Sequence, residues 1–406
     1  MTQVDELLLR CIRLGLRSTP APSEWNYTSD EWCALLQASA AQNLLPLVYE
    51  TIYGCPSYKT LEKTVRDQYR DKALQLATRQ IVQNNEFLTL LLHAQRAGLE
   101  PIVLKGAVVR SLYPMPMLRP SVDEDLLVDP AETEAYHRFL LSEGLFADDP
   151  DADLSQAQEL SYHKENSPTY IELHTSLFPP DSAAYGDCNA LFAGALERTV
   201  TVQIEDVPVR TLAPTDHLLY LICHAYKHFL HSGVGIRQVC DIGMFTKSYG
   251  GEIDWHRVVS ACQSIRIQQF AAAIFRITEG YLGFAMPTAF APFDVDESDL
   301  LEDILSGGLY GTADINRLHS STMTLEAVTA EKTGRHRSGM LHSVFLPAKD
   351  LSGRYPYLRR HPWLLPAAWV QRLWGYAARR KSVDPAETIR IGNDRISLLR
   401  EYGIID

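Results

Sequence analysis

The first hundred residues alternate apolar and polar positions with a helical period. Apolar side chains recur at spacings of three and four in four segments, residues 5–16, 29–53, 61–80 and 84–98. Ser29 or Asp30 is the expected N-cap of the second segment, and Gly98 is the expected C-cap of the fourth. The chain therefore begins with an all-helical region.

After Gly98 the pattern changes to short runs of the kind found in β-strands. These runs lie at residues 101–104, 122–128, 169–178 and 199–212. The last run predicts a hairpin that turns at Glu205 and Asp206. A helix is expected after the second run, with Asp129 as its cap and Pro130 at its first position. Strands and helices thus alternate in a small α/β unit.

From Thr215 onward helical periodicity returns, interrupted by a polar, glycine- and threonine-rich segment at residues 311–339. We expect that segment to be a mobile loop or linker. The predicted fold class is α+β, a small mixed-sheet core flanked by helical regions. The predicted division is 1–84 for the N-terminal helices, 85–212 for the α/β core and 213–406 for the C-terminal helices.

Composition and charge narrow the classes of partner. The 406 residues are 46% hydrophobic and 22% charged, which is typical of a folded globular protein, and the net charge is -12. An acidic chain argues against long nucleic acid or an anionic membrane as the main partner. The first residues carry acids at positions 5 and 6, which is wrong for a signal peptide, and no run approaches the roughly 18 apolar residues of a membrane span. The seven cysteines never fall in CxxC spacing. We therefore expect a cytoplasmic protein with reduced cysteines.

Acidic residues on two predicted strands suggest metal chemistry. Side chains alternate along a strand, so Asp123 and Asp125 project to one side while Glu124 points to the other. A later strand offers Glu172 and, on the same face, His174. Three carboxylates on adjacent strands can hold divalent ions for phosphoryl transfer, and magnesium, with manganese as an alternative, prefers such oxygen ligands. The alternative is that Asp123–Asp125 simply ends a strand at a solvated edge.

Ahead of these acids the order strand, glycine, helix places Gly106 where backbone N–H groups can approach a phosphate. Lys105 adds a mobile positive charge to this region and Arg119 a bidentate one. Ordinary salt bridges at the surface are the competing interpretation for both. In the later helix, Lys227 and His228 could line a nucleotide cleft, and His224 with His228 could bridge a metal or have a structural role.

The ordered motifs LKG (104–106), LYP (112–114), DED (123–125), ELH (172–174), PTDHLLYLICHAYKH (214–228), IRQVCDIGMF (236–245) and DWHRVV (254–259) resemble those of an uncharacterised bacterial nucleotidyltransferase family in the DNA polymerase beta-like superfamily. The similarity extends over nearly the whole chain. It implies a magnesium-dependent enzyme that moves a nucleoside monophosphate from a nucleoside triphosphate such as ATP to an acceptor and releases pyrophosphate.

The resemblance also implies roles for residues. Asp123, Asp125 and Glu172 are the expected catalytic metal ligands. The expected nucleotide contacts are Lys105, Gly106, Arg119, His174 and Lys227. The acceptor, whether a small molecule, lipid, peptide or protein, is not identified by the sequence, and no membrane partner is expected.

Two positions depart from the family pattern. Ala107 stands where a serine or glycine usually follows the glycine, and Glu124 stands where the middle of the acidic pair is usually apolar. These departures leave a second hypothesis open, a regulatory protein that binds a nucleotide or a partner without turnover. A third is a metal-dependent phosphohydrolase with water as the acceptor.

Overall fold

The computed structural model describes residues 1–231, 233–308, 315–334, 355, 357–371 and 385–406. Its centre is a mixed sheet of seven strands in the order β3-β4-β5-β2-β1-β7-β6. The strands are β1 (Ile102–Val103), β2 (Glu124–Leu127), β3 (Leu145–Ala147), β4 (Glu159–Lys164), β5 (Tyr170–His174), β6 (Thr199–Ile204) and β7 (Val207–Leu212). With its many helices this sheet confirms the predicted α+β class.

Strand pairing brings distant segments together. In the middle of the sheet β2 runs parallel to β5 and antiparallel to β1, while β1 runs parallel to β7. The predicted hairpin is confirmed as β6 and β7, with Glu205 at its turn in a left-handed conformation (φ 53°). The pattern of the sequence missed β3 and β4, which form one edge. β3 is only three residues long, and only Leu160 and Tyr162 of β4 are buried.

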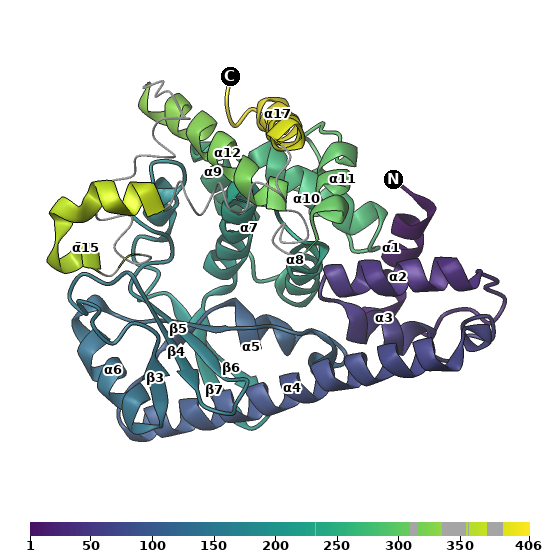
Figure 1. Ribbon diagram of the computed structural model, residues 1–406, viewed down its shortest axis with the longest axis horizontal. Helices are drawn as coiled ribbons and strands as arrows, with labels where there is room; N and C mark the ends of the chain where they lie inside the picture. The colour runs from purple at the N-terminus through teal and green to yellow at the C-terminus, as the bar shows by residue number, and fades with distance from the viewer. Residues whose placement is uncertain (232, 309–314, 335–354, 356, 372–384) are drawn as a thin grey trace.

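The N-terminal helices are α1 (Gln3–Gly15), α2 (Ser29–Ala41), α3 (Leu45–Ile52) and α4 (Lys63–Arg96), with a 3-10 turn η1 (Tyr58–Thr60) before α4. The N-cap prediction was wrong, because Thr28 caps α2 and forms a capping box with Glu31. The segments 61–80 and 84–98 form one 34-residue helix, α4, with Gly98 in a left-handed conformation just after it. Figure 1 shows α4 running along the base of the molecule from the N-terminal helices to the sheet, so it crosses the proposed boundary at residue 84.

Short helices and turns connect the strands of the sheet. They are α5 (Lys105–Arg110), η2 (Pro116–Leu118), η3 (Pro130–Glu132), α6 (Thr133–Ser142) and η4 (Gly186–Phe192). The Asp129 cap is confirmed, since its carboxylate accepts a hydrogen bond from Ala131 N and Pro130 follows it. Residues of α4, α6 and the sheet form one apolar cluster, which includes Phe87, Tyr136 and Ile171.

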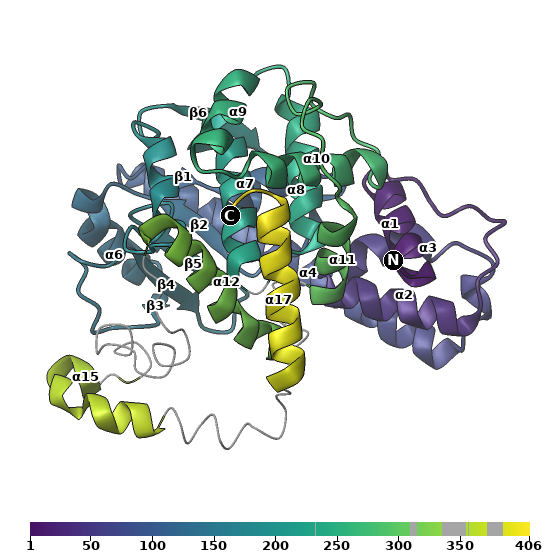
Figure 2. The same ribbon diagram turned by 90° about the horizontal axis from the view of Figure 1, so that it is seen from above.

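The C-terminal helices are α7 (Pro214–His231), α8 (Ile236–Tyr249), α9 (Trp255–Ser264), α10 (Gln268–Gly280), α11 (Ser298–Gly307), α12 (Ile315–Thr333), α15 (Tyr357–Arg360), η6 (Pro362–Leu364) and α17 (Pro385–Glu401). The loop prediction for 311–339 was wrong over Ile315–Thr333, which is helical, while 311–314 and 335–339 lie outside the described residues. In both views α12 and α17 lie side by side (Figures 1 and 2).

The N-terminal and C-terminal helices share one apolar core, which includes Leu8, Trp32, Leu218 and Phe270. Polar contacts also join them, because Gln42 donates to Ile304 O at 3.0 Å and Arg17 donates to Leu282 O at 3.0 Å. The two helical regions therefore support the sheet as one body. We find no helix in the described part of the chain whose length and apolar content suit a membrane span.

Candidate active site

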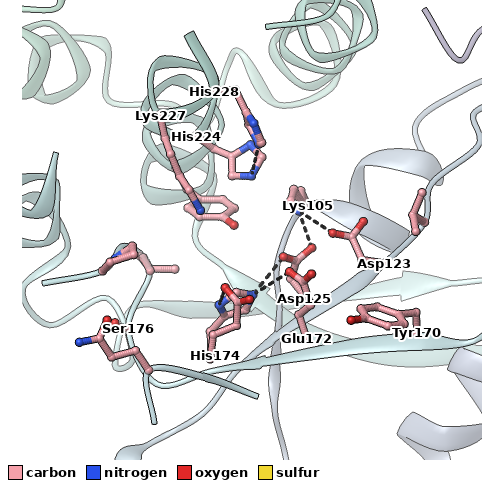
Figure 3. A pocket seen from close by; sticks show the side chains of 16 residues that line it. Lys105, Asp123, Asp125, Tyr170, Glu172, His174, Ser176, His224, Lys227 and His228 are labelled. Carbon is pink, nitrogen blue, oxygen red and sulfur yellow. Dashed lines mark hydrogen bonds and ion pairs between the residues drawn. The ribbon is translucent and has the colours of Figure 1, made fainter. Parts of the chain in front are cut away.

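The pairing register of β2 and β5 determines where the candidate site lies. These parallel neighbours place Asp125 directly beside Glu172, and Asp123 lies one residue before β2 begins. The Asp125 side chain is buried, whereas those of Glu172 and Asp123 are about a quarter exposed. The sheet thus brings the three predicted carboxylates to one place, and Figure 3 shows them around a common space.

His174 follows two residues after Glu172 and lies on the same face of β5. Its Nε2 is 3.1 Å from Asp125 Oδ1 and 3.6 Å from Glu172 Oε2, and its Nδ1 is 3.6 Å from Glu159 Oε2. Burial alone would lower the pKa of His174, but the hydrogen bonds to Asp125 and Glu172 outweigh it and raise the pKa to about 9. His174 is therefore a cation at neutral pH in the metal-free protein.

Lys105, the first residue of α5, reaches the same carboxylates. Its Nζ lies 2.7 Å from Asp125 Oδ2 and 3.5 Å from Asp123 Oδ2. Burial would raise the pKa of Asp125, but Lys105 and His174 together hold it below its ordinary value. Asp125 therefore stays ionised although it is buried.

Glu124 points to the opposite side of β2, as the alternation predicts, and is fully buried there. Its Oε1 accepts a hydrogen bond from Arg110 at 2.6 Å, and its Oε2 accepts one from the backbone N–H of Ala107 at 2.8 Å. A Cβ atom on Gly106 would clash with Glu124 Oε2. The absence of a side chain at Gly106 therefore makes room for the Glu124 carboxylate.

Arg119 lies buried beside α8, where it lines a second, smaller pocket together with Gly106, Asp123 and Asp125. It donates to both carboxylate oxygens of Asp241, at 3.0 and 2.6 Å, and the Tyr113 hydroxyl donates to the same group at 2.7 Å. Burial would raise the pKa of Asp241, but Arg119 overrides it and lowers that pKa. This bidentate pair ties the loop before Asp123 to the C-terminal helices.

Helix α7 forms the wall opposite the carboxylates. His224, Lys227 and His228 lie on its inner face in Figure 3, and the Nε2 atoms of the two histidines are 3.2 Å apart. Burial lowers the pKa of both histidines well below its ordinary value. A cavity of about 510 Å³ lies between α7 and the sheet and is lined by Lys105, Val122, Asp123, Asp125, Gln158, Glu159, Tyr170, Glu172, His174, Ser176, Leu177, Pro179, Tyr220, His224, Lys227 and His228. That volume is within the range of small-molecule sites.

A family model described as an uncharacterised nucleotidyltransferase matches residues 28–283. The chain belongs to this family. No curated protein and no solved structure matches the chain. All residues that line the cavity lie inside the matched region, whereas the helices from α11 onward lie outside it.

In this nucleotidyltransferase, Asp125, Glu172 and His174 form a cluster able to hold a metal ion. Each offers one ligand atom, and these atoms lie within 4.8 Å of one another. The carboxylate oxygens suit a hard divalent cation, and the imidazole nitrogen widens the choice to transition metals. The sequence analysis predicts His174 as a nucleotide contact. In the structure His174 also lies beside both acids, which makes it a candidate metal ligand as well.

Glu159 and Tyr220 are among the cavity residues of the nucleotidyltransferase that the sequence analysis did not single out. Glu159 faces His174 across the β4–β5 pairing, and it could have been found only if β4 had been recognised. Tyr220 lies one helical turn before His224 and lines the same cavity. The helical spacing of three and four along residues 217–231 was the available signal for Tyr220.

Proposed function

We propose that the protein transfers a nucleoside monophosphate from a nucleoside triphosphate to a hydroxyl-bearing acceptor, with Mg²⁺ or Mn²⁺ as cofactor. The observation that carries this proposal is the register of β2 and β5, which sets Asp125 and Glu172 side by side at the floor of the cavity. Family membership supplies the reaction class. The carboxylates supply the chemistry that nucleotidyl transfer requires.

Asp125 and Glu172 would hold the cation, with Asp123 at the rim and His174 behind them. A divalent ion bound there would neutralise charge on the phosphate oxygens. Lys105 already contacts both Asp123 and Asp125, so its ammonium group lies where it can pass to a phosphate oxygen once those acids take a cation. The chain therefore presents both ligands and a counter-charge at one end of the cavity.

Glu172 is the proposed base, because its side chain is 24% exposed whereas that of Asp125 is only 3% exposed. In the reaction its carboxylate takes the proton of the acceptor hydroxyl. The acceptor oxygen then bonds to the α-phosphorus, the bond from that phosphorus to the bridging oxygen breaks, and pyrophosphate leaves.

The test is a screen of the full chain with the four labelled nucleoside triphosphates, Mg²⁺ or Mn²⁺, and pools of acceptors, with pyrophosphate release as the readout. Asp125→Asn should abolish release while the circular dichroism spectrum stays unchanged. Asp206→Asn, at the exposed hairpin turn, is the matched control and should keep full activity. Equal pyrophosphate release by wild type and Asp125→Asn would exclude the proposed metal role.

One observation favours a second candidate, a nucleotide-binding protein without turnover. Lys105 and His174 already contact the two oxygens of Asp125, so the acid is neutralised by the protein itself. Saturable binding of a nucleoside triphosphate with no pyrophosphate release in any acceptor pool would support this candidate.

A further inference from the structure

The turn at Gly106 and Ala107 already holds an anion that belongs to the protein. The Ala107 N–H donates to Glu124 Oε2 at 2.8 Å, and the other Glu124 oxygen receives Arg110 at 2.6 Å and Gln83 at 3.3 Å. A phosphate approaching the turn would meet the like charge of this carboxylate. The backbone N–H of Ala107 is therefore committed before any nucleotide arrives.

The charges around the cavity separate into two walls. The sheet supplies Asp125, Glu172 and Glu159, while α7 supplies Lys227 with His224 and His228. Lys105 and Lys227 are the lysines that line the cavity. Lys105 is held by Asp125 and Asp123, but within the described part of the chain Lys227 has no carboxylate within ion-pair distance. Figure 3 shows the Lys227 side chain reaching from α7 toward the sheet.

We propose that Lys227 on α7, in place of the Gly106 turn, binds the polyphosphate group of the nucleotide. This inference rests on the proposed function. A polyphosphate bound here would lie between Lys227 on the α7 wall and cations held by the carboxylates of the sheet. Its negative charge would then face positive charge on both sides. The acids of the sheet wall, two of them already paired with Lys105, and the lysine of the α7 wall leave that layer between opposite charges.

His224 and His228 also lie on the cavity face of α7, but Lys227 is the group that carries the positive charge there. Their Nε2 atoms are 3.2 Å apart, within hydrogen-bond distance, and His224 is buried while His228 is half-buried. They therefore supply shape and a hydrogen-bonded wall, while Lys227 supplies the charge.

The first experiment measures binding of inorganic tripolyphosphate to the full chain by calorimetry, in EDTA and low salt, with every protein carrying Asp125→Asn. That background lacks the proposed metal site, so the result does not depend on turnover. Adding Lys227→Ala should weaken binding about tenfold, the loss typical of one hydrogen bond to a charged group. Lys227→Arg should keep most of the affinity, and Lys247→Ala, at an exposed lysine of α8, should match the background.

The second experiment separates the nucleotide from an anionic acceptor. Binding of α,β-methylene analogues of the four nucleoside triphosphates is measured with Mg²⁺ in the otherwise wild-type chain. Lys227→Ala should weaken every analogue that binds, by about tenfold. Unchanged tripolyphosphate binding in the first experiment, or unchanged analogue binding in the second, would overturn the inference. Pyrophosphate release that survives Asp125→Asn would instead sink the proposed function and leave the Lys227 result standing.

Discussion

The two faces of strand β2 carry neighbouring carboxylates in opposite surroundings. Glu124 and Asp125 are both almost completely buried, at 0% and 2% exposure. The partners of Glu124 are a buried arginine, a glutamine and a backbone N–H, all inside the fold. Those of Asp125 are Lys105 and His174, which line the cavity.

The pKa directions of the two acids differ accordingly. Burial raises the pKa of Glu124 and is not fully offset by Arg110. Burial would also raise the pKa of Asp125, but Lys105 and His174 reverse it. Equal burial therefore says little about the role of an acid. What distinguishes a chemical site from a structural ion pair is that the partners of the acid border a cavity and are able to rearrange.

The largest effect is expected on the cavity face. Glu172→Gln should lower pyrophosphate release more than about 100-fold, because even outer partners of metal ligands are typically worth 10- to 100-fold. Glu159→Gln is the matched control, since Glu159 also contacts His174 but its side chain is 48% exposed, and it should lose less than about tenfold. Similar losses in the two variants would contradict a special role for the acid beside Asp125.

On the opposite face we expect loss of stability. Glu124→Ala should lower the free energy of unfolding by about 3 to 5 kcal/mol, because the Arg110 charge stays buried without its carboxylate. Urea denaturation measures this change. The double variant Glu124→Leu with Arg110→Leu should recover much of the loss, since it removes both charges together. A change below about 1 kcal/mol in Glu124→Ala would show that this ion pair is not structural.

Much of the fold followed from periodicity, and the parts that failed have physical reasons. The hairpin and the α/β alternation were predictable because apolar positions repeat regularly there. Strands β3 and β4 were not, because β3 is only three residues long and only two of the six side chains of β4 are buried. The helix at Ile315–Thr333 was hidden by serine and threonine, whose weak propensity is overridden when Val328 and Thr324 pack inside the protein.

For the site, the alternation rule correctly separated Asp125 from Glu124, and the register with Glu172 required the sheet. The sequence favoured a phosphate at Gly106 because a glycine before a helix is typical of such turns. Only the structure shows the Glu124 carboxylate beside it. Arg119 and Asp241 are 122 residues apart, so no local pattern could have paired them.

A third prediction tests the reason for Gly106. Gly106→Ala should destabilise the protein because its Cβ would meet Glu124 Oε2. In a Glu124→Asp background the shorter side chain withdraws the carboxylate, so the same substitution should be milder by about 1 to 2 kcal/mol, a coupling typical of residues in contact. Urea denaturation of the four proteins gives this coupling. Effects that add within about 0.5 kcal/mol would argue that Gly106 is needed for something other than Glu124.

The smallest effect concerns the pH dependence of stability in the metal-free protein. The pKa of His174 is raised from 6.5 to about 9, so the folded protein binds this proton more tightly than the unfolded chain does. The resulting stabilisation is complete below about pH 6.5 and is lost as pH rises through 9. In EDTA, wild type should therefore exceed His174→Gln in free energy of unfolding at pH 6, and this advantage should shrink by pH 9.5.

Substitutions on the two faces of β2 should also differ in their effect on the pKa of His174. Burial lowers the pKa of His174, and the hydrogen bond to Asp125 is the largest influence that raises it. NMR titration of the His174 ring should therefore show a lower pKa in Asp125→Asn. Glu124→Gln, one residue away but on the opposite face, should leave that pKa where it is in wild type. Equal shifts in the two variants would mean that His174 senses the net charge of the strand, and that its bond to Asp125 has no special influence.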